Sequence, residues 1–175
     1  MWCLEIIGYI MRRCMDNIIN NKGKLLFIIS WIAVLFWMLF IFNLSSQAAD
    51  QSDKLSIGVT EIIVEAVEKV TPGYDLNIRE FNHILRKNAH FFAYLVLGVL
   101  VVSALRQSGI KGLRAFALAL SICVLYAVSD EVHQLFVPGR GGQAVDVLID
   151  SAGAIFGIVG YMFLRLKKHS NWSKM

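Results

Sequence analysis

Four apolar stretches of near-membrane length constrain this 175-residue chain more than any other feature. They cover residues 25–44, 89–105, 113–128 and 145–164. A hydrocarbon core about 30 Å thick needs about 20 apolar residues in a helix, and polar residues at their ends can lengthen the two shorter stretches. The chain is 57% hydrophobic and only 17% charged, with a mean hydropathy of +0.59, which is too apolar for a soluble domain of this size. We therefore predict an all-α membrane protein with four transmembrane helices.

Basic residues flank these stretches in the N-terminal segment, in the loop between the second and third stretches, and in the C-terminal tail. They are Arg12, Arg13, Lys22 and Lys24, then Arg106, Lys111 and Arg114, then Arg165, Lys167, Lys168 and Lys174. Lysine and arginine in short flanks favour the cytoplasmic side, so both termini are expected inside (N-in, C-in) and residues 45–88 and 129–144 outside. These flanks account for the net charge of +4, and no nucleic-acid partner is expected.

The chain is divided into a cytoplasmic segment (1–24), a transmembrane domain (25–165) and a basic cytoplasmic tail (166–175). The expected spans are about 25–44, 87–105, 113–134 and 145–164. The first is about twice as long as the apolar region of a signal peptide, so an uncleaved span is favoured, with cleavage near Ser46-Gln47-Ala48 as the alternative. Within the outer segment, apolar residues from Leu55 to Val70 repeat at helical spacing, which predicts an extracytoplasmic amphipathic helix. Asn77 with Glu80 resembles a capping box, so a new helix is expected to start there and continue into the second span.

Three polar clusters lie at the outer ends of the predicted spans. They are Arg86 to His90, Asp130 to Gln134, and Arg140 with Asp146 and Asp150. Ionisable residues at membrane depth cost several kcal/mol, so they indicate a functional site. At 1.5 Å per residue, His90, Asp130 and Asp150 each lie about 22–24 Å along the helix from the cytoplasmic arginine of the same span. The sequence therefore predicts that these three residues lie at one depth.

Helical spacing gathers further side chains around them. Lys87, His90 and Tyr94 share one face with His83, Asp130 and Gln134 are one turn apart, and so are Asp146 and Asp150. The turn at Pro138-Gly139 is expected to aim Arg140 back toward the same region. We predict an outward-facing polar pocket with these substrate-binding residues: Arg86, Lys87, His90, Asp130, Glu131, Gln134, Arg140, Asp146 and Asp150.

Three uses of such a pocket remain open. The polar residues could bind or transport a ligand, since arginine and lysine at membrane depth suit a phosphate group. They could be catalytic, with His90, Asp130 and Asp150 as candidates, where His90 is preferred over His133 because His133 can face away. They could also only hold the helices together, in which case Asp150→Asn loses folded protein.

No motif in the chain specifies a metal or another cofactor. Two aspartates one turn apart with a histidine could bind a divalent cation, but no ligand spacing singles out a metal site, so no metal ligands are assigned. Cys3, Cys14 and Cys123 have neither metal-binding spacing nor an even count for disulfides. Gly153 and Gly157 have the spacing that allows close helix approach within the bundle, which says nothing of the oligomeric state.

The clusters carry a resemblance to a known family. Arg86-Lys87-x-x-His90-Phe91-x-x-Tyr94, Asp130-Glu131-x-His133-Gln134-x-Phe136-x-Pro138-Gly139-Arg140 and Asp146-x-x-x-Asp150-x-x-Gly153 resemble the motifs of the VanZ-like membrane protein family. Ser45-Ser46-Gln47 is similar to the family's opening motif, and the resemblance covers about residues 30–165.

The resemblance implies a multi-span protein of the bacterial cell membrane, in a family whose named member confers low-level resistance to teicoplanin. The expected function is to affect susceptibility to such lipoglycopeptides by binding or handling a membrane lipid or lipid-linked cell-wall precursor. The alternative is a membrane enzyme, a hydrolase or transferase, acting on a lipid phosphate or glycolipid.

Overall fold

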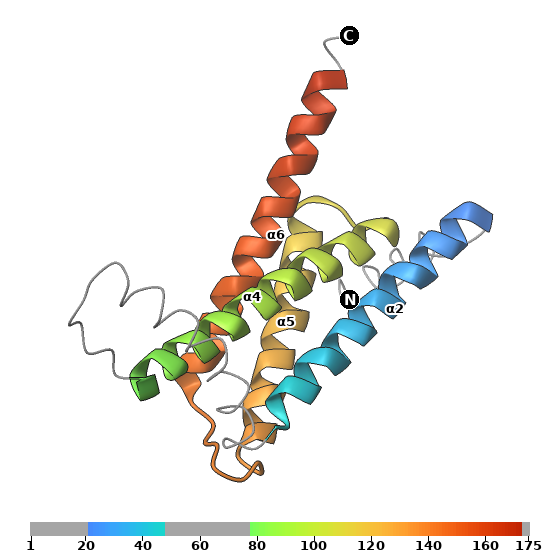
Figure 1. Cartoon of the computed structure of the whole chain (residues 1–175). Coiled ribbons are helices and arrows are strands. Elements are labelled where there is room, and N and C mark those ends of the chain that lie inside the picture. The colour runs from blue at the N-terminus through green and yellow to red at the C-terminus, as the bar shows by residue number, and fades with distance from the viewer. Residues whose placement is uncertain (1–20, 48–77, 173–175) are drawn as a thin grey trace, which may run out of the picture.

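The computed structural model of the chain describes residues 21–47 and 78–172, which form four helices and no strand (Figure 1). The helices are α2 (Asn21–Ser45), α4 (Ile78–Gln107), α5 (Gly112–Gln134) and α6 (Ala144–Trp172). Each is long and apolar enough to cross a membrane, which confirms the four predicted spans. The predicted amphipathic helix lies outside the described residues.

The polar end clusters lengthen the helices, as the sequence predicted. The helix that carries the second span runs unbroken from Ile78, and α5 continues through Asp130 to Gln134. Continuous helices are expected because, in a membrane, each backbone N–H and C=O must find its partner within the protein. The polar residues of α4 and α5 therefore lie on regular helix, and their positions follow helical spacing.

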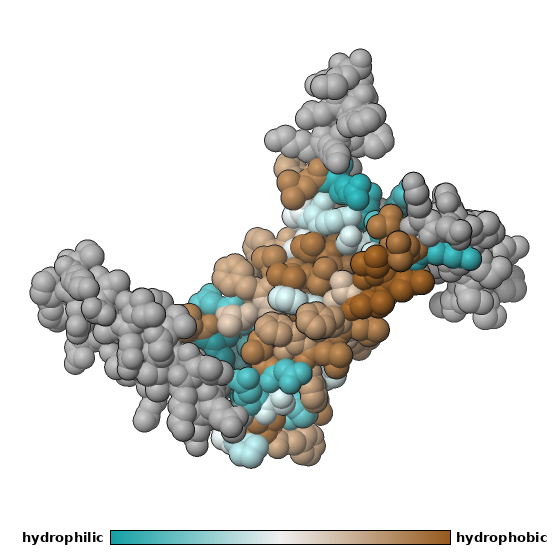
Figure 2. Space-filling model, turned by 45° about the vertical axis from the view of Figure 1, so that its right-hand side comes forward, coloured by the Kyte–Doolittle hydropathy of each residue, from teal (hydrophilic) through white to brown (hydrophobic). Residues whose placement is uncertain are grey.

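The surface of the bundle carries a broad apolar band. Figure 2 shows hydrophobic side chains across the middle of the molecule, with hydrophilic side chains toward either end. Large apolar side chains remain exposed on every helix, such as Phe36, Phe92, Leu125 and Phe163. Such a continuous band fits contact with lipid, where apolar side chains need no cover from other protein. The structure is that of a multi-pass membrane protein.

Helix α4 is central to the bundle. Its largest contact is with α6, and it also packs against α2 and α5. The buried core contains small and medium side chains from all four helices, among them Val34, Leu97, Val101, Ala119 and Ile158. These side chains lie between the ends of the bundle, so the polar clusters occupy a separate layer.

Glycines bring α4 and α6 into backbone contact. A methyl group on Gly157 would overlap the backbone oxygen of Leu95, and one on Gly153 would overlap that of Phe91. On the facing side, a methyl group on Gly98 would lie 2.5 Å from the backbone oxygen of Ala154. Close approach through the GxxxG-spaced pair, predicted from the sequence, is thus confirmed. The close approach of α4 and α6 also brings together the side chains that flank these glycines on the two helices.

Hydrogen bonds attach α2, whose side chains are mostly exposed, to its neighbours. The Trp37 indole donates to the backbone oxygen of Ala93 at 2.9 Å, and the Tyr126 hydroxyl donates to that of Met38 at 2.5 Å. These bonds link α2 to α4 and to α5. Individual hydrogen bonds between membrane helices contribute about 0.6 kcal/mol on average, so together they supplement the limited packing of α2.

Candidate functional site

The three predicted clusters meet at one end of the bundle, called here the cluster end. It comprises the C-terminal ends of α2 and α5 and the N-terminal ends of α4 and α6 (Figure 1). Alternating helix directions bring these four ends together. The site therefore draws side chains from segments that are far apart in the chain.

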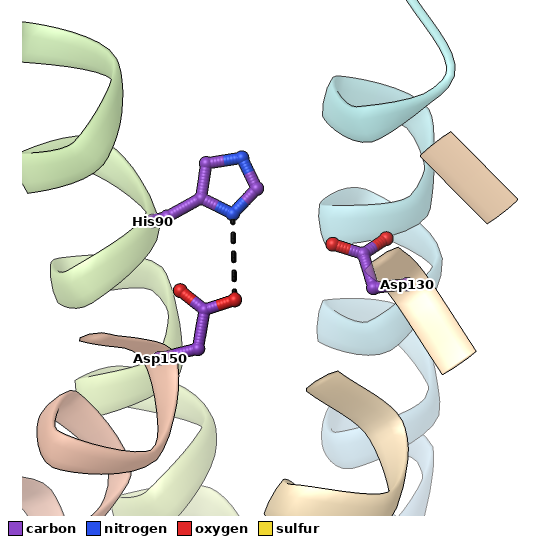
Figure 3. A group of neighbouring side chains, drawn as sticks. All are labelled: His90, Asp130 and Asp150. Carbon is purple, nitrogen blue, oxygen red and sulfur yellow. Dashed lines mark ion pairs between the residues drawn. The ribbon is translucent and has the colours of Figure 1, made fainter. Parts of the chain in front are cut away.

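His90, Asp130 and Asp150 form the centre of the site. They come from α4, α5 and α6, and one ligand atom of each lies within 4.8 Å of a ligand atom of the other two. His90 Nδ1 lies 3.7 Å from Asp150 Oδ2, and Asp130 faces this pair from across the bundle (Figure 3). This proximity agrees with the sequence estimate that the three residues share one depth.

Burial of this centre is nearly complete. Asp150 is 0% exposed, Asp130 2%, and the His90 side chain 17%. Gly153, one turn after Asp150, lies against the backbone of Phe91, the residue after His90. The glycine contact between α4 and α6 therefore holds His90 beside Asp150.

Several buried polar atoms of the centre have no hydrogen-bond partner among the described residues. They are His90 Nδ1, Asp130 Oδ1 and both carboxylate oxygens of Asp150. The distance between His90 and Asp150 is too long for a hydrogen bond. Most buried side-chain polar atoms in proteins are bonded, so four such atoms in one place call for a specific explanation, such as a catalytic role or a bound ion.

Two hydroxyl residues complete the centre. Ser45, the last residue of α2, donates a hydrogen bond of 2.8 Å to Asp130 Oδ2. Tyr94 lies one turn after His90 and is fully buried, with a hydroxyl that has no hydrogen-bond partner within the described part of the chain. The sequence placed Tyr94 on the His90 face without a role, and it did not link Ser45 to Asp130. The Ser45-Ser46-Gln47 motif was the available signal for Ser45.

An ion pair lies beside this centre. Lys87 Nζ is 3.1 Å from Asp146 Oδ1, and both side chains are about a quarter exposed, at 26% and 23%. Asp146 and Asp150 share a helical face, as predicted, but they have different partners. Asp146 contacts Lys87, whereas Asp150 contacts His90, so the two aspartates belong to two different pairs of side chains.

Glu131 and Gln134 hold the loop that follows α5. Glu131 Oε2 accepts a hydrogen bond of 2.8 Å from the backbone N–H of Gln143, while Oε1 accepts one of 3.2 Å from Gln134. The backbone oxygen of Glu131 also lies 2.8 Å from the position of a methyl group on Gly142. Residues 135–143 are therefore bound back onto α5. Sequence reasoning did not find the part played by Gln143, which contributes through its backbone.

Arg140 returns toward the site, as the sequence predicted. Gly139 has a φ of 76°, a left-handed conformation that glycine adopts without strain, and this turn directs the next residue inward. Arg140 Nη2 then donates to the backbone oxygen of Leu44 at 3.3 Å.

Arg86 is half-buried on α4, close in sequence to Lys87. His133 stacks on Phe42 with ring centroids 4.5 Å apart, outside the group of three.

This geometry can serve two kinds of chemistry. A histidine beside a buried carboxylate can transfer protons, and one imidazole with two carboxylates can coordinate a metal ion. The adjacent cations Lys87 and Arg140 can hold an anionic group. The residues that provide these functions come from α4, α5, α6 and the loop after α5, so the site requires the folded bundle.

Four membrane-length helices around a buried histidine and two aspartates define a multi-pass membrane protein with a buried polar site at one end of its helix bundle. A comparison with protein families matches residues 29–165 to the VanZ/LLP1 family, and the chain belongs to this family. The match includes most of all four spans and the whole polar site, so the resemblance inferred from the motifs is confirmed. The chain matches no curated protein and no solved structure.

Proposed function

We propose that this protein binds or handles an anionic membrane lipid or lipid-linked cell-wall precursor at the cluster end of the bundle. The cluster end faces outward across the cell membrane in this proposal, with both termini in the cytoplasm. The observation that carries it is a set of four buried polar atoms on His90, Asp130 and Asp150 that have no hydrogen-bond partner among the described residues. A network that only joined helices would satisfy such atoms with one another.

The charges and surfaces around the centre suit a lipid with an anionic head. Lys87 and Arg140 can contact phosphate oxygens, because charge-assisted hydrogen bonds are the strong ones. Apolar side chains on the spans lie close to this end, including Phe92 and Leu148, which are exposed. A lipid could therefore place its head at the polar site while its chain stays in contact with the bilayer.

A binding assay on the purified protein tests this proposal. We expect binding of a polyprenyl phosphate, with a polyprenol of the same length as the neutral comparison. Lys87→Gln and Arg140→Gln should each weaken binding about tenfold, the equivalent of one charge-assisted hydrogen bond. Lys111→Gln is the control, because Lys111 is an exposed cation at the other end of the bundle. Equal binding by all variants rejects the proposal.

Family membership supports a role in susceptibility to lipoglycopeptides. Expression of the wild type in a sensitive Gram-positive host should raise tolerance of teicoplanin more than that of vancomycin. Asp150→Asn at a matched membrane level should lose this effect. Protection by both the wild type and Asp150→Asn would mean that the polar site is not needed for the effect. Protection by neither would mean that this chain does not confer resistance.

A second candidate, a membrane enzyme acting on a lipid phosphate or glycolipid, is supported by the proximity of His90 to Asp150. In this reading His90 is the acid or base and Asp150 orients its ring. Incubation with polyprenyl phosphates, with and without divalent metal ions, followed by mass spectrometry tests it. A product that disappears in His90→Gln supports catalysis, and the absence of any product from the wild type counts against it.

A further inference from the structure

We propose that His90, Asp130 and Asp150 bind one divalent transition-metal ion. The inference goes beyond the lipid role proposed above, because an ion can be bound whether or not a lipid is the substrate. Each residue provides a ligand atom from a different helix, and the three atoms lie within 4.8 Å of one another. Figure 3 shows the three side chains facing a common space.

The distances suit coordination. Metal–nitrogen and metal–oxygen bonds are about 2.0–2.2 Å long, so three ligands of one ion lie about 3–4 Å from one another. The observed limit of 4.8 Å is about 1 Å larger, so the three side chains would turn inward to close around an ion. This adjustment would fall on the side chains, because α4 and α6 are fixed in backbone contact at Gly153 and Gly157.

The charge balance favours a cation of charge +2. Two carboxylates and a neutral imidazole carry two negative charges in a buried place, which is expensive unless it is compensated. Lys87 is paired with Asp146. A divalent ion at the centre would neutralise both aspartates at once.

Polar atoms of the three residues that lack hydrogen-bond partners among the described residues favour a bound ligand over a network of side chains bonded to one another. Asp150 is fully buried with neither carboxylate oxygen hydrogen-bonded in the described part of the chain, and His90 Nδ1 and Asp130 Oδ1 are also unpartnered. Ser45 occupies only the other oxygen of Asp130. The Ser45 hydroxyl would orient the Asp130 carboxylate through this hydrogen bond and leave Asp130 Oδ1 available to the ion.

The donor set selects the class of metal. One imidazole nitrogen with carboxylate oxygens suits Zn²⁺ or Mn²⁺, whereas Mg²⁺ and Ca²⁺ prefer oxygen ligands alone. None of the three ligands is a thiolate. Three protein ligands leave a coordination position open, as in catalytic metal sites. If the proposed lipid function holds, that position can accept a phosphate oxygen.

Metal retention by the full-length protein, purified in detergent without a histidine tag, tests the proposal. After treatment with a chelator, the protein is equilibrated with Zn²⁺, Mn²⁺ or Mg²⁺, freed of unbound ion and assayed for metal content. We expect about one Zn²⁺ or Mn²⁺ per wild-type chain and little Mg²⁺. His90→Gln and Asp150→Asn should retain less than a third as much as the wild type.

Matched controls are available on the same helices. His133→Gln and Asp146→Asn should retain the metal, because His133 stacks on Phe42 and Asp146 pairs with Lys87. Retention of equal metal by His90→Gln or Asp150→Asn overturns the assignment. Should these variants fail to fold, the wild type alone decides: Zn²⁺ or Mn²⁺ must raise its unfolding temperature reversibly, and no shift overturns the proposal.

Discussion

Ser45 donates a hydrogen bond of 2.8 Å to Asp130, a residue 85 positions later in the chain. Both side chains are buried, at 0% and 2% exposure, and they join the last turn of α2 to the last turn of α5. This bond links the helix with the fewest buried side chains to the centre of the polar site. It also fixes which oxygen of Asp130 remains available to His90 and Asp150.

Ser45→Ala should destabilise the protein by about 1–3 kcal/mol, because it leaves a buried carboxylate oxygen without its donor. The free energy of unfolding can be measured by SDS titration in mixed micelles. Ser46→Ala is the matched control, since Ser46 is exposed and its hydroxyl donates to the nearby backbone oxygen of Asn43. It should change stability by less than about 0.5 kcal/mol. Equal effects of the two changes would contradict the importance of the bond to Asp130.

Gly157→Ala should destabilise the bundle by about 1–3 kcal/mol, because the added methyl group meets the backbone of Leu95, which cannot move aside easily. Gly160→Ala, one turn later on α6, adds the same group where nothing lies within 4 Å. Alanine is the better helix former, so this control should be neutral or stabilising by up to about 1 kcal/mol. The same unfolding titration measures both. Effects of the same sign would argue against close packing of α4 and α6.

Tyr94→Phe should not destabilise the protein, because the hydroxyl that it removes is buried without a hydrogen-bond partner among the described residues. Tyr126→Phe, whose ring centroid lies 6.1 Å from that of Tyr94, should cost about 0.5–1.5 kcal/mol through the lost bond to Met38. Thermal unfolding of the two variants in detergent compares them directly. A large loss from Tyr94→Phe would show that its hydroxyl has a partner.

The Lys87–Asp146 ion pair should have a coupling energy of about 0.2–1 kcal/mol, since both side chains are partly exposed. A double-mutant cycle with Lys87→Met, Asp146→Asn and the double variant measures it by unfolding titration. The cycle separates the stability of the pair from any role of Lys87 in binding an anion. A coupling energy well above 2 kcal/mol would mean that the pair is a structural element of the bundle.

Cysteine labelling tests the proposed orientation. In a background with Cys3, Cys14 and Cys123 replaced by alanine, Gly141→Cys should react with a membrane-impermeant maleimide in intact cells. Gly141 is exposed in the loop after α5, and a methyl group there meets nothing within 4 Å. Lys111→Cys, at the opposite end, should react only after the membrane is opened. The reverse pattern would mean that the cluster end faces the cytoplasm.

Much of the fold follows from the linear pattern of apolar residues. Four membrane-length stretches predict four helices, and the helices that carry Asp130 and His90 extend through their polar ends as expected. The reason is physical: a spanning segment satisfies its backbone within its own helix, so its existence depends little on its neighbours. The glycines at 153 and 157 likewise indicate close packing, although their partners on α4 could not be named.

The sequence predicts which residues form the site better than it predicts which of them contact one another. The common depth of His90, Asp130 and Asp150 follows from counting residues along helices, and the structure brings them together. The pairings of Asp146 with Lys87 and of Glu131 with the backbone of Gln143 do not follow from spacing. They depend on the rotation of each helix about its axis. A stretch that is apolar on every face does not specify this rotation.

The sequence by itself thus determined the number of spans, the grouping of His90, Asp130 and Asp150, and the family. Only the tertiary structure decided that Ser45 bonds to Asp130, that His90 lies beside Asp150, and that Tyr94 is buried with them. Hydropathy and helical rise act along one chain segment and can be read locally. Contacts between segments arise when backbones pack at particular glycines and rotations, so they appear only in the assembled bundle.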